Sequence, residues 1–113
     1  LGIGTDLGRL MKRGEVRWYV FSRPDKKRPV LILTRDSALD FLGEVTVAPI
    51  TSTIRDIPSE VLLTNTDGMP TDCAVNLDHL QTVSKEKIGS LITTLNASKM
   101  QQMRPSLLFA LGF

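Results

Sequence analysis

Short runs of apolar and β-branched residues, each closed by a turn, recur along the chain as far as Leu95. Val16–Phe21 is typical, because Val, Trp, Tyr and Phe crowd together shortly after a glycine. Runs this short, bounded by Gly, Pro, Asp or Ser, predict β-strands rather than helices. We therefore expect strands at Val16–Phe21, Pro29–Thr34, Glu44–Ile50 and Val61–Leu63, at Cys73–Leu77 and Leu80–Val83 (one bent strand or two short ones), and at Leu91–Leu95.

Two short helical segments are expected between these strands. Asp36 is a candidate N-cap for a segment over Ser37–Leu42, which Gly43 would end. Ser84–Lys87 is expected to form a single helical turn. The Asp-Gly step within Thr66–Pro70 predicts a tight turn.

The pattern changes after Asn96, where apolar residues begin to recur at helical spacing. Asn96 is a good N-cap, so an amphipathic helix is expected, and Pro105 inside it should kink the helix or begin a second short one. The chain is thus expected to be mainly β with some α (α+β), a small curled antiparallel sheet or partial barrel with a C-terminal helix laid across it. The apolar positions of this helix are Met100, Met103, Leu107, Leu108 and Leu111.

Length and composition indicate one soluble globular domain. The chain has 113 residues, 42% hydrophobic and 23% charged, and no apolar run reaches the roughly 18 residues of a membrane span. We place the domain at residues 11–113 and expect Leu1–Leu10 to be a cloning remnant or a disordered extension, because this segment has neither a basic stretch nor a cleavage motif. Cys73 is the only cysteine, which excludes an intramolecular disulfide and favours the reducing cytoplasm.

Positive charge is concentrated in the first third of the chain. The net charge is only +2, but residues 1–35 hold nine Lys or Arg against three Asp or Glu, whereas residues 36–113 hold five against nine. Such an asymmetry predicts one basic face that a polyanion would bind. The alternative is that folding scatters these charges over separate faces.

The sequence excludes most metal-dependent and nucleophilic enzymes. With one His and one Cys it lacks the ligand sets of zinc sites, and it has neither a glycine-rich nucleotide loop nor a Gly-x-Ser-x-Gly elbow. We therefore expect no metal and no cofactor, and a chemistry that arginine and hydroxyl groups support.

Arg28 and Thr51 are the candidates for that chemistry. Pro29 pushes Arg28 into an extended conformation at the start of a strand, and Thr51 follows the end of another. Cleavage of RNA by its own 2′-hydroxyl fits, because a guanidinium donates two parallel hydrogen bonds to the phosphorane dianion and a hydroxyl binds a non-bridging oxygen. The alternatives are a solvated loop arginine and a turn threonine bonded to local backbone.

Five segments, in order, resemble the MazF/PemK toxins, whose fold is of the CcdB/PemK type. The resemblance spans residues 11–113 and implies a homodimeric, metal-independent endoribonuclease toxin with Arg28 and Thr51 as its catalytic pair. Such a toxin cuts single-stranded RNA at short sequences to leave 2′,3′-cyclic phosphate and 5′-hydroxyl ends, and a cognate antitoxin blocks it by lying across the dimer groove. The segments are Lys12–Val16, Arg28–Leu33, Ala48–Ser52, Asp72–Val83 and the Leu-rich C-terminal helix.

RNA contacts are expected beyond the catalytic pair. Lys26 and Lys27 are expected to contact phosphates, and the resemblance places five further residues along the RNA groove. Base preference does not transfer, because the loop Ser22–Lys27 is shorter than is usual in the family and His79-Leu80-Gln81 stands where the family has Gln-Ile-Arg. Of the two roles open to His79, we expect contact with RNA rather than proton transfer. The five groove residues are Arg35, Ser52, Ile57, Pro58 and His79.

Two other functions stay open for the same small barrel. Some toxins of this shape bind a protein target such as DNA gyrase, and such a protein would expose an apolar patch from its C-terminal helix. The other is a transcriptional regulator that acts together with its antitoxin. Because the chain has no helix-turn-helix pattern, it would act as a corepressor. The Arg-Pro-Val-Leu and Ile-Thr-Ser segments favour the nuclease.

Overall fold

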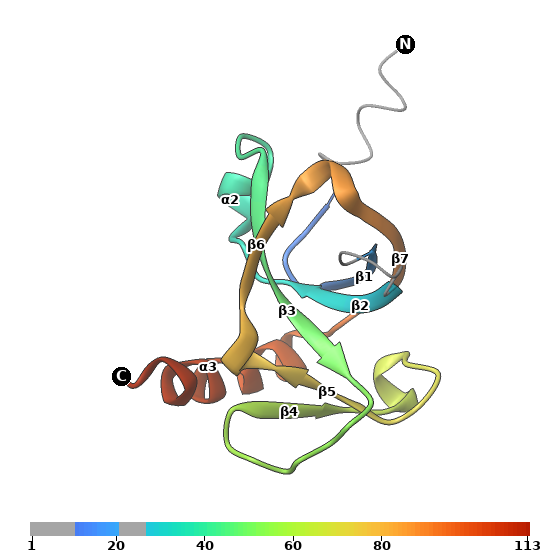
Figure 1. Ribbon diagram of the computed structural model, residues 1–113, viewed down its shortest axis with the longest axis vertical. Helices are drawn as coiled ribbons and strands as arrows, with labels where there is room; N and C mark the ends of the chain where they lie inside the picture. The colour runs from blue at the N-terminus through green and yellow to red at the C-terminus, as the bar shows by residue number, and fades with distance from the viewer. Residues whose placement is uncertain (1–10, 21–26) are drawn as a thin grey trace.

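The computed structural model describes residues 11–20 and 27–113, so the expected N-terminal extension and Lys26 lie outside the described residues. Within these ranges, seven strands form one antiparallel sheet in the order β4-β5-β3-β2-β1-β7, and β6 pairs with β3 off this path (Figure 1). The C-terminal helix α3 completes the predicted α+β fold, which is confirmed. The strands are β1 Glu15–Val20, β2 Lys27–Ile32, β3 Glu44–Thr51, β4 Glu60–Leu63, β5 Cys73–Asn76, β6 Gln81–Ser84 and β7 Ile88–Thr94.

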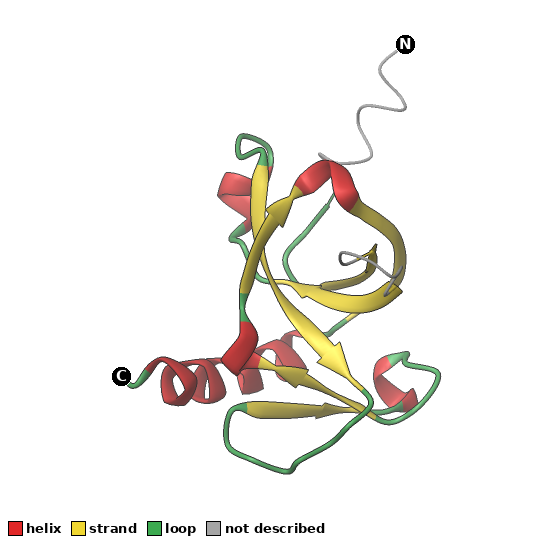
Figure 2. Ribbon diagram, viewed as in Figure 1, coloured by secondary structure: helices red, strands yellow, loops and turns green. Residues whose placement is uncertain are grey.

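The sheet curls around β3, its longest strand. The first half of β3 pairs with β6, its middle with β2 and its last two residues with β5, so three strands meet on β3 (Figure 2). The segment expected to be one bent strand or two short ones forms two strands, β5 and β6. The single-turn 3₁₀ helix η2 (Leu77–His79) separates them.

Two apolar clusters lie on the two sides of β2. Leu31 belongs to the larger cluster and Val30 and Ile32 to the smaller one, and all three are fully buried. Because side chains alternate along a strand, burial on both faces makes β2 a continuous apolar run in the sequence. Met103 of α3 enters the larger cluster, and Leu39 of the short helix α2 enters the smaller.

Helix α3 runs from Ala97 to Leu111 without interruption. The side chain of Asn96 accepts a hydrogen bond from the backbone N–H of Lys99 (2.8 Å), which confirms Asn96 as the N-cap. Of the two outcomes expected at Pro105, a kink or a second short helix, the second helix is wrong. Pro105 and Gln101, whose carbonyl loses its N–H donor, are both exposed residues of α3. No helix in the described ranges has the length and hydrophobicity of a membrane span.

The predicted N-cap role of Asp36 is wrong. Helix α2 spans Asp36–Leu39, its N-cap is Arg35, and no side chain caps its first turn. The carboxylate of Asp36 instead accepts a hydrogen bond from the backbone N–H of Arg13 (2.7 Å), a residue far away in the sequence. Tertiary pairing therefore takes the acceptor that local sequence assigned to the helix end.

Gly68 occupies a backbone conformation that favours glycine. It follows the 3₁₀ turn η1 (Asn65–Asp67) with φ +93°, and a Cβ at this position would collide with the hydroxyl of Thr93. That hydroxyl is not free to move aside, because it donates to the carbonyl of Asp67 (3.0 Å).

We predict that Gly68→Ala lowers the free energy of unfolding by more than the approximately 1–3 kcal/mol that a strained backbone costs alone. Gly112→Ala is the matched control, since Gly112 has φ +82° but open space where its Cβ would lie. Urea denaturation of both variants measures the difference. Equal losses would mean that Thr93 moves away without cost.

Candidate active site

The register of β2 against β3 brings Arg28 and Thr51 to the same edge of the sheet. Val30 pairs with Pro49 and Leu31 with Ala48, and just beyond these paired residues Arg28 and Thr51 both line one cavity. Arg28 is the exposed second residue of β2, and Thr51 is the half-buried last residue of β3 rather than the first residue after it.

A cavity of about 540 Å³ opens at this edge of the sheet. The Arg28 guanidinium, the Lys27 ammonium and the hydroxyl of Thr51 belong to its walls, a set of donors that suits an anion. Within residues 11–20 and 27–113 no ion pair engages Arg28, so its charge is available to a ligand. The lining residues are Trp18, Lys27, Arg28, Pro29, Ile50, Thr51, Ser52, Met69, Pro70, Thr71 and Cys73.

The geometry of Thr51 is compatible with both roles that its sequence position suggested. Its Oγ1 accepts a hydrogen bond from the backbone N–H of Thr53 (3.0 Å), which is the local turn contact expected of a threonine here. That contact fixes the oxygen and uses only a lone pair, so the hydroxyl proton remains a donor. Turn formation and ligand binding are therefore compatible at this residue.

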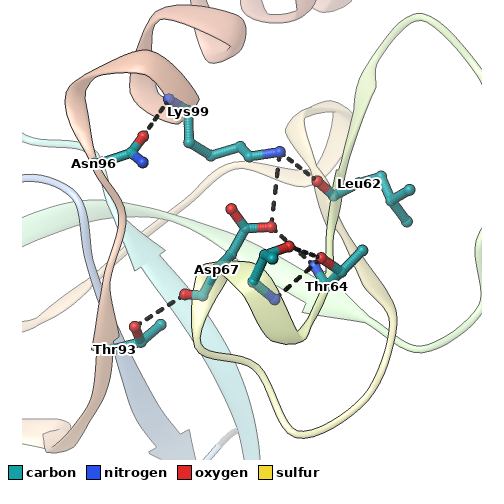
Figure 3. Close-up of polar contacts among 7 residues, drawn as sticks. Leu62, Thr64, Asp67, Thr93, Asn96 and Lys99 are labelled. Atoms are coloured by element: carbon teal, nitrogen blue, oxygen red, sulfur yellow. Dashed lines mark hydrogen bonds and ion pairs between the residues drawn. The ribbon is translucent and has the colours of Figure 1, made fainter.

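The opposite wall of the cavity, Met69 to Cys73, follows the turn η1 and is held by a polar network (Figure 3). Thr64 and Asp67 cap each other's backbone N–H groups at η1. The ammonium of Lys99 donates to the carbonyl of Leu62 (3.2 Å) and lies 3.7 Å from a carboxylate oxygen of Asp67. Together with the bond from Thr93, this network ties the wall to β7 and to the first turn of α3.

The residues predicted to contact RNA lie in separate parts of the folded structure. Lys27 and Ser52 line the cavity beside Arg28 and Thr51. Arg35 lies beyond the opposite end of β2, where its Nε donates to Ser37 (3.1 Å).

Ile57, Pro58 and His79 form a second exposed group, at the far end of β5 from the cavity. The loop that carries Ile57 and Pro58 reaches η2 through Ser59, whose hydroxyl donates to Asp78 Oδ2 (2.5 Å) and whose carbonyl accepts from Leu77 N (3.0 Å). His79 follows directly in η2.

The basic residues of the first third do not all gather at the cavity. Arg17 pairs with Glu15 (2.8 Å) and donates to the carbonyl of Gly89 (3.0 Å), beside β7. Arg13 donates to the carbonyl of Leu33 (2.7 Å), near α2. Among the described cations only Lys27 and Arg28 line the cavity, so the structure favours the alternative in which the charges scatter.

Sequence reasoning missed the apolar part of the cavity. Trp18, Met69 and Pro70 line it, although Trp18 had been assigned only to a strand and the other two only to a turn. One signal for Trp18 was available in the sequence, because pairing of the first two predicted strands brings Trp18 near Lys27. In the structure, the ammonium of Lys27 lies 5.0 Å from the centroid of the Trp18 ring.

The family profile described as PemK-like, MazF-like toxin of type II toxin-antitoxin system matches residues 12–111. The chain belongs to this family. Probable endoribonuclease MazF2 of Mycobacterium tuberculosis is 38% identical over 93 residues, which cover 81% of this chain and 89% of that protein. Endoribonuclease MazF3 of the same species is 41% identical over 88 residues, which cover 78% and 82%. The solved structure of Mycobacterium tuberculosis toxin MazF-mt6 matches with a TM-score of 0.81 and 33% identity, over 88% of this chain and 97% of that one.

Acidic, His and Cys side chains of this toxin are dispersed. In the part of the chain that the structure describes, no three of them come close enough together to hold a metal ion. Cys73 is buried and also borders the cavity. Burial raises the pKa of its thiol above the ordinary value, and the negative charges of Asp72 and Asp67 raise this pKa further.

We predict that Cys73 reacts slowly with iodoacetamide in the native toxin at pH 8. The thiolate is the reactive form, and because the pKa of Cys73 is raised, a smaller fraction of its thiol is ionised at a given pH. The rate should rise steeply when urea unfolds the chain at the same pH. Mass spectrometry of the alkylated protein gives both rates, and a native rate equal to that of the unfolded chain would contradict the prediction.

Proposed function

We propose that this toxin is a sequence-specific, metal-independent endoribonuclease that cuts single-stranded RNA by attack of the 2′-hydroxyl. The class of activity rests on the family, because the chain is a MazF-like toxin and the curated relatives at 38% and 41% identity are named endoribonucleases. The observation that carries the mechanism is the meeting of Arg28 and Thr51 at one cavity.

The proposed reaction needs no group beyond the substrate and this chain. The 2′-oxygen forms a bond to phosphorus and loses its proton, the bond from phosphorus to the 5′-oxygen breaks, and the departing oxygen gains a proton. The products are a 2′,3′-cyclic phosphate and a 5′-hydroxyl end. Arg28 donates two parallel hydrogen bonds to the phosphorane dianion, and the Thr51 hydroxyl donates to a non-bridging oxygen.

Recognition is proposed to use both exposed groups of residues. Lys27 contacts phosphates next to the cavity, together with Ser52. Lys26, which lies outside the described residues, is also proposed to contact phosphates. Arg35, Ile57, Pro58 and His79 lie away from the cavity within one chain, so they serve a longer groove that two copies form together.

A homodimer and a cognate antitoxin are the proposed protein partners. The family is defined as the toxin half of a toxin–antitoxin pair. The end of α3 offers apolar surface for a partner, since Phe109 is 59% and Phe113 is 90% exposed. A gyrase-binding toxin would expose the same surface, so the patch does not separate the two functions. The meeting of Arg28 and Thr51 at one cavity favours the nuclease, because a binding-only protein would not need it.

We predict that the toxin sediments at micromolar concentration with about twice its monomer mass of 12.5 kDa. If the end of α3 is the interface, Phe109→Asp should shift the mass toward the monomer, because the charge would be buried unpaired. Phe41→Asp is the matched control, since Phe41 is 86% exposed and lies beside α2. A parent that sediments as a monomer would contradict the dimer.

The test of the catalytic proposal is a cleavage assay in EDTA. We predict that Arg28→Ala lowers the rate by about 10²–10³, as the loss of one transition-state donor does elsewhere. Arg28→Lys should restore little, because an ammonium keeps the charge but not the planar fork. Thr51→Ala should cost less than Arg28→Ala, and Thr51→Ser should keep much of the activity.

The control for charge is Arg104→Ala, which removes an exposed arginine of α3 and should leave the rate unchanged. The 5′ ends of the products should accept phosphate from polynucleotide kinase without prior dephosphorylation. If Arg28→Ala cleaved at the parent rate, or EDTA stopped the reaction, the mechanism would be wrong.

A further inference from the structure

The cavity beside Arg28 and Thr51 has an apolar wall that phosphate chemistry does not use. Trp18, Pro29, Met69 and Pro70 line it together with the cationic and hydroxyl groups. A site for phosphate alone requires donors and charge, whereas an unpaired nucleobase requires an aromatic face to stack on and polar groups at its edge. This cavity has both sets of groups.

The backbone of β7 is shaped around Trp18. In the pairing of β1 with β7, Arg17 lies opposite Leu91 and Tyr19 opposite Ile88, so two residues of β7 face the single residue Trp18. This is a β-bulge, a feature that re-aims a side chain and occurs often beside active sites. The register shift between β1 and β7 therefore falls at Trp18, one of the residues that line the cavity.

Gly89, within this bulge, lets β7 approach Trp18 closely. A Cβ at Gly89 would lie 3.2 Å from the carbonyl oxygen of Trp18, which is tighter than most Cβ contacts in proteins, and 3.5 Å from the Cβ of Trp18, which is ordinary van der Waals contact. The carbonyl of Gly89 also accepts a hydrogen bond from Arg17 (3.0 Å). The backbone of β7 at Gly89 thus lies against the backbone and Cβ of Trp18.

The face of the indole ring is reachable from solvent. The side chain of Lys27 is exposed, yet its ammonium lies 5.0 Å from the centroid of the Trp18 ring. A solvated cation over an aromatic face is weakly held and can be exchanged for a flat ligand. Once displaced, the ammonium is beside the phosphates that flank that ligand.

We propose that Trp18 is the stacking platform for one nucleobase next to the scissile phosphate, which makes it a specificity-determining residue. The base replaces the ammonium of Lys27 over the indole, and Ser52 and Thr71 are placed to meet its polar edge. This inference rests on the proposed function, because it names the part of the RNA that the active-site cavity binds.

The test uses the fact that Trp18 is the only tryptophan in the chain, so intrinsic fluorescence reports on it alone. The probes are a short mixed-sequence RNA with every 2′-hydroxyl methylated, which cannot be cleaved, and an abasic strand of the same length and charge. The base-bearing strand should quench the fluorescence and bind about 5- to 150-fold more tightly than the abasic strand. Movement of Lys27 toward phosphate alone would give the same quenching with both strands and would overturn the proposal.

Three variants extend the test, with binding followed by the anisotropy of labelled strands. Trp18→Leu keeps apolar volume but not the aromatic face, and should bring the affinity for the base-bearing strand near that for the abasic one. Trp18→Phe should retain part of the preference. Phe41→Leu, which removes an exposed aromatic outside the cavity, should leave both affinities unchanged.

The outcomes also separate this inference from the proposed function. If the parent cleaves unmodified RNA but binds both strands equally and without quenching, the stacking role is wrong while the nuclease stands. If the parent neither binds nor cleaves RNA, both fail. Should Trp18→Leu not fold, the quenching and the affinity ratio of the parent still decide the question.

Discussion

The antiparallel pairing of β2 with β3 is the constraint on which the rest of this structure depends. It separates the two apolar clusters, because Leu31 belongs to one and Val30 and Ile32 to the other. The same register aligns Arg28 with Thr51 at the open end of the pair. A slip by one residue would exchange the two buried faces and separate the two polar side chains, so core packing and site geometry are set together.

Pro49 shows how β3 changes partners without losing hydrogen bonds. Thr46 accepts from Leu33 N (3.0 Å), on the β2 side of the strand. Backbone groups alternate along a strand, so the position of the missing N–H of Pro49 faces the other side. There β6 pairs as far as Val47 and β5 begins at Ile50, so Pro49 lies in the gap between them. A proline at this position removes a donor that has no acceptor strand.

The strands were predictable because their apolar composition and their turns are local properties of the sequence. Arg28 and Thr51 were predictable as candidates because each stands at the end of such a strand. The bulge opposite Trp18 was not predictable, because it depends on how β7 pairs with β1. The residues of either strand alone do not specify that register. Asp36 failed as a cap for the same reason, because Arg13 reaches it only through the fold. Local preference gave the elements, while long-range pairing decided which side chains meet.

Catalysis and recognition depend on different parts of this architecture. The two proposed catalytic groups sit on strands whose register the core enforces, and such positions tolerate little change. The far wall of the cavity instead follows η1 and is tied to α3 and β7 through Asp67, Lys99 and Thr93. The exposed group of Ile57, Pro58 and His79 is separate from both, at the end of β5 away from the cavity. Changes in η1 or in the loop at Ile57 can therefore alter which base is accepted without moving Arg28 against Thr51. Under the proposed function, that separation would let the same reaction be combined with different RNA preferences within a single fold.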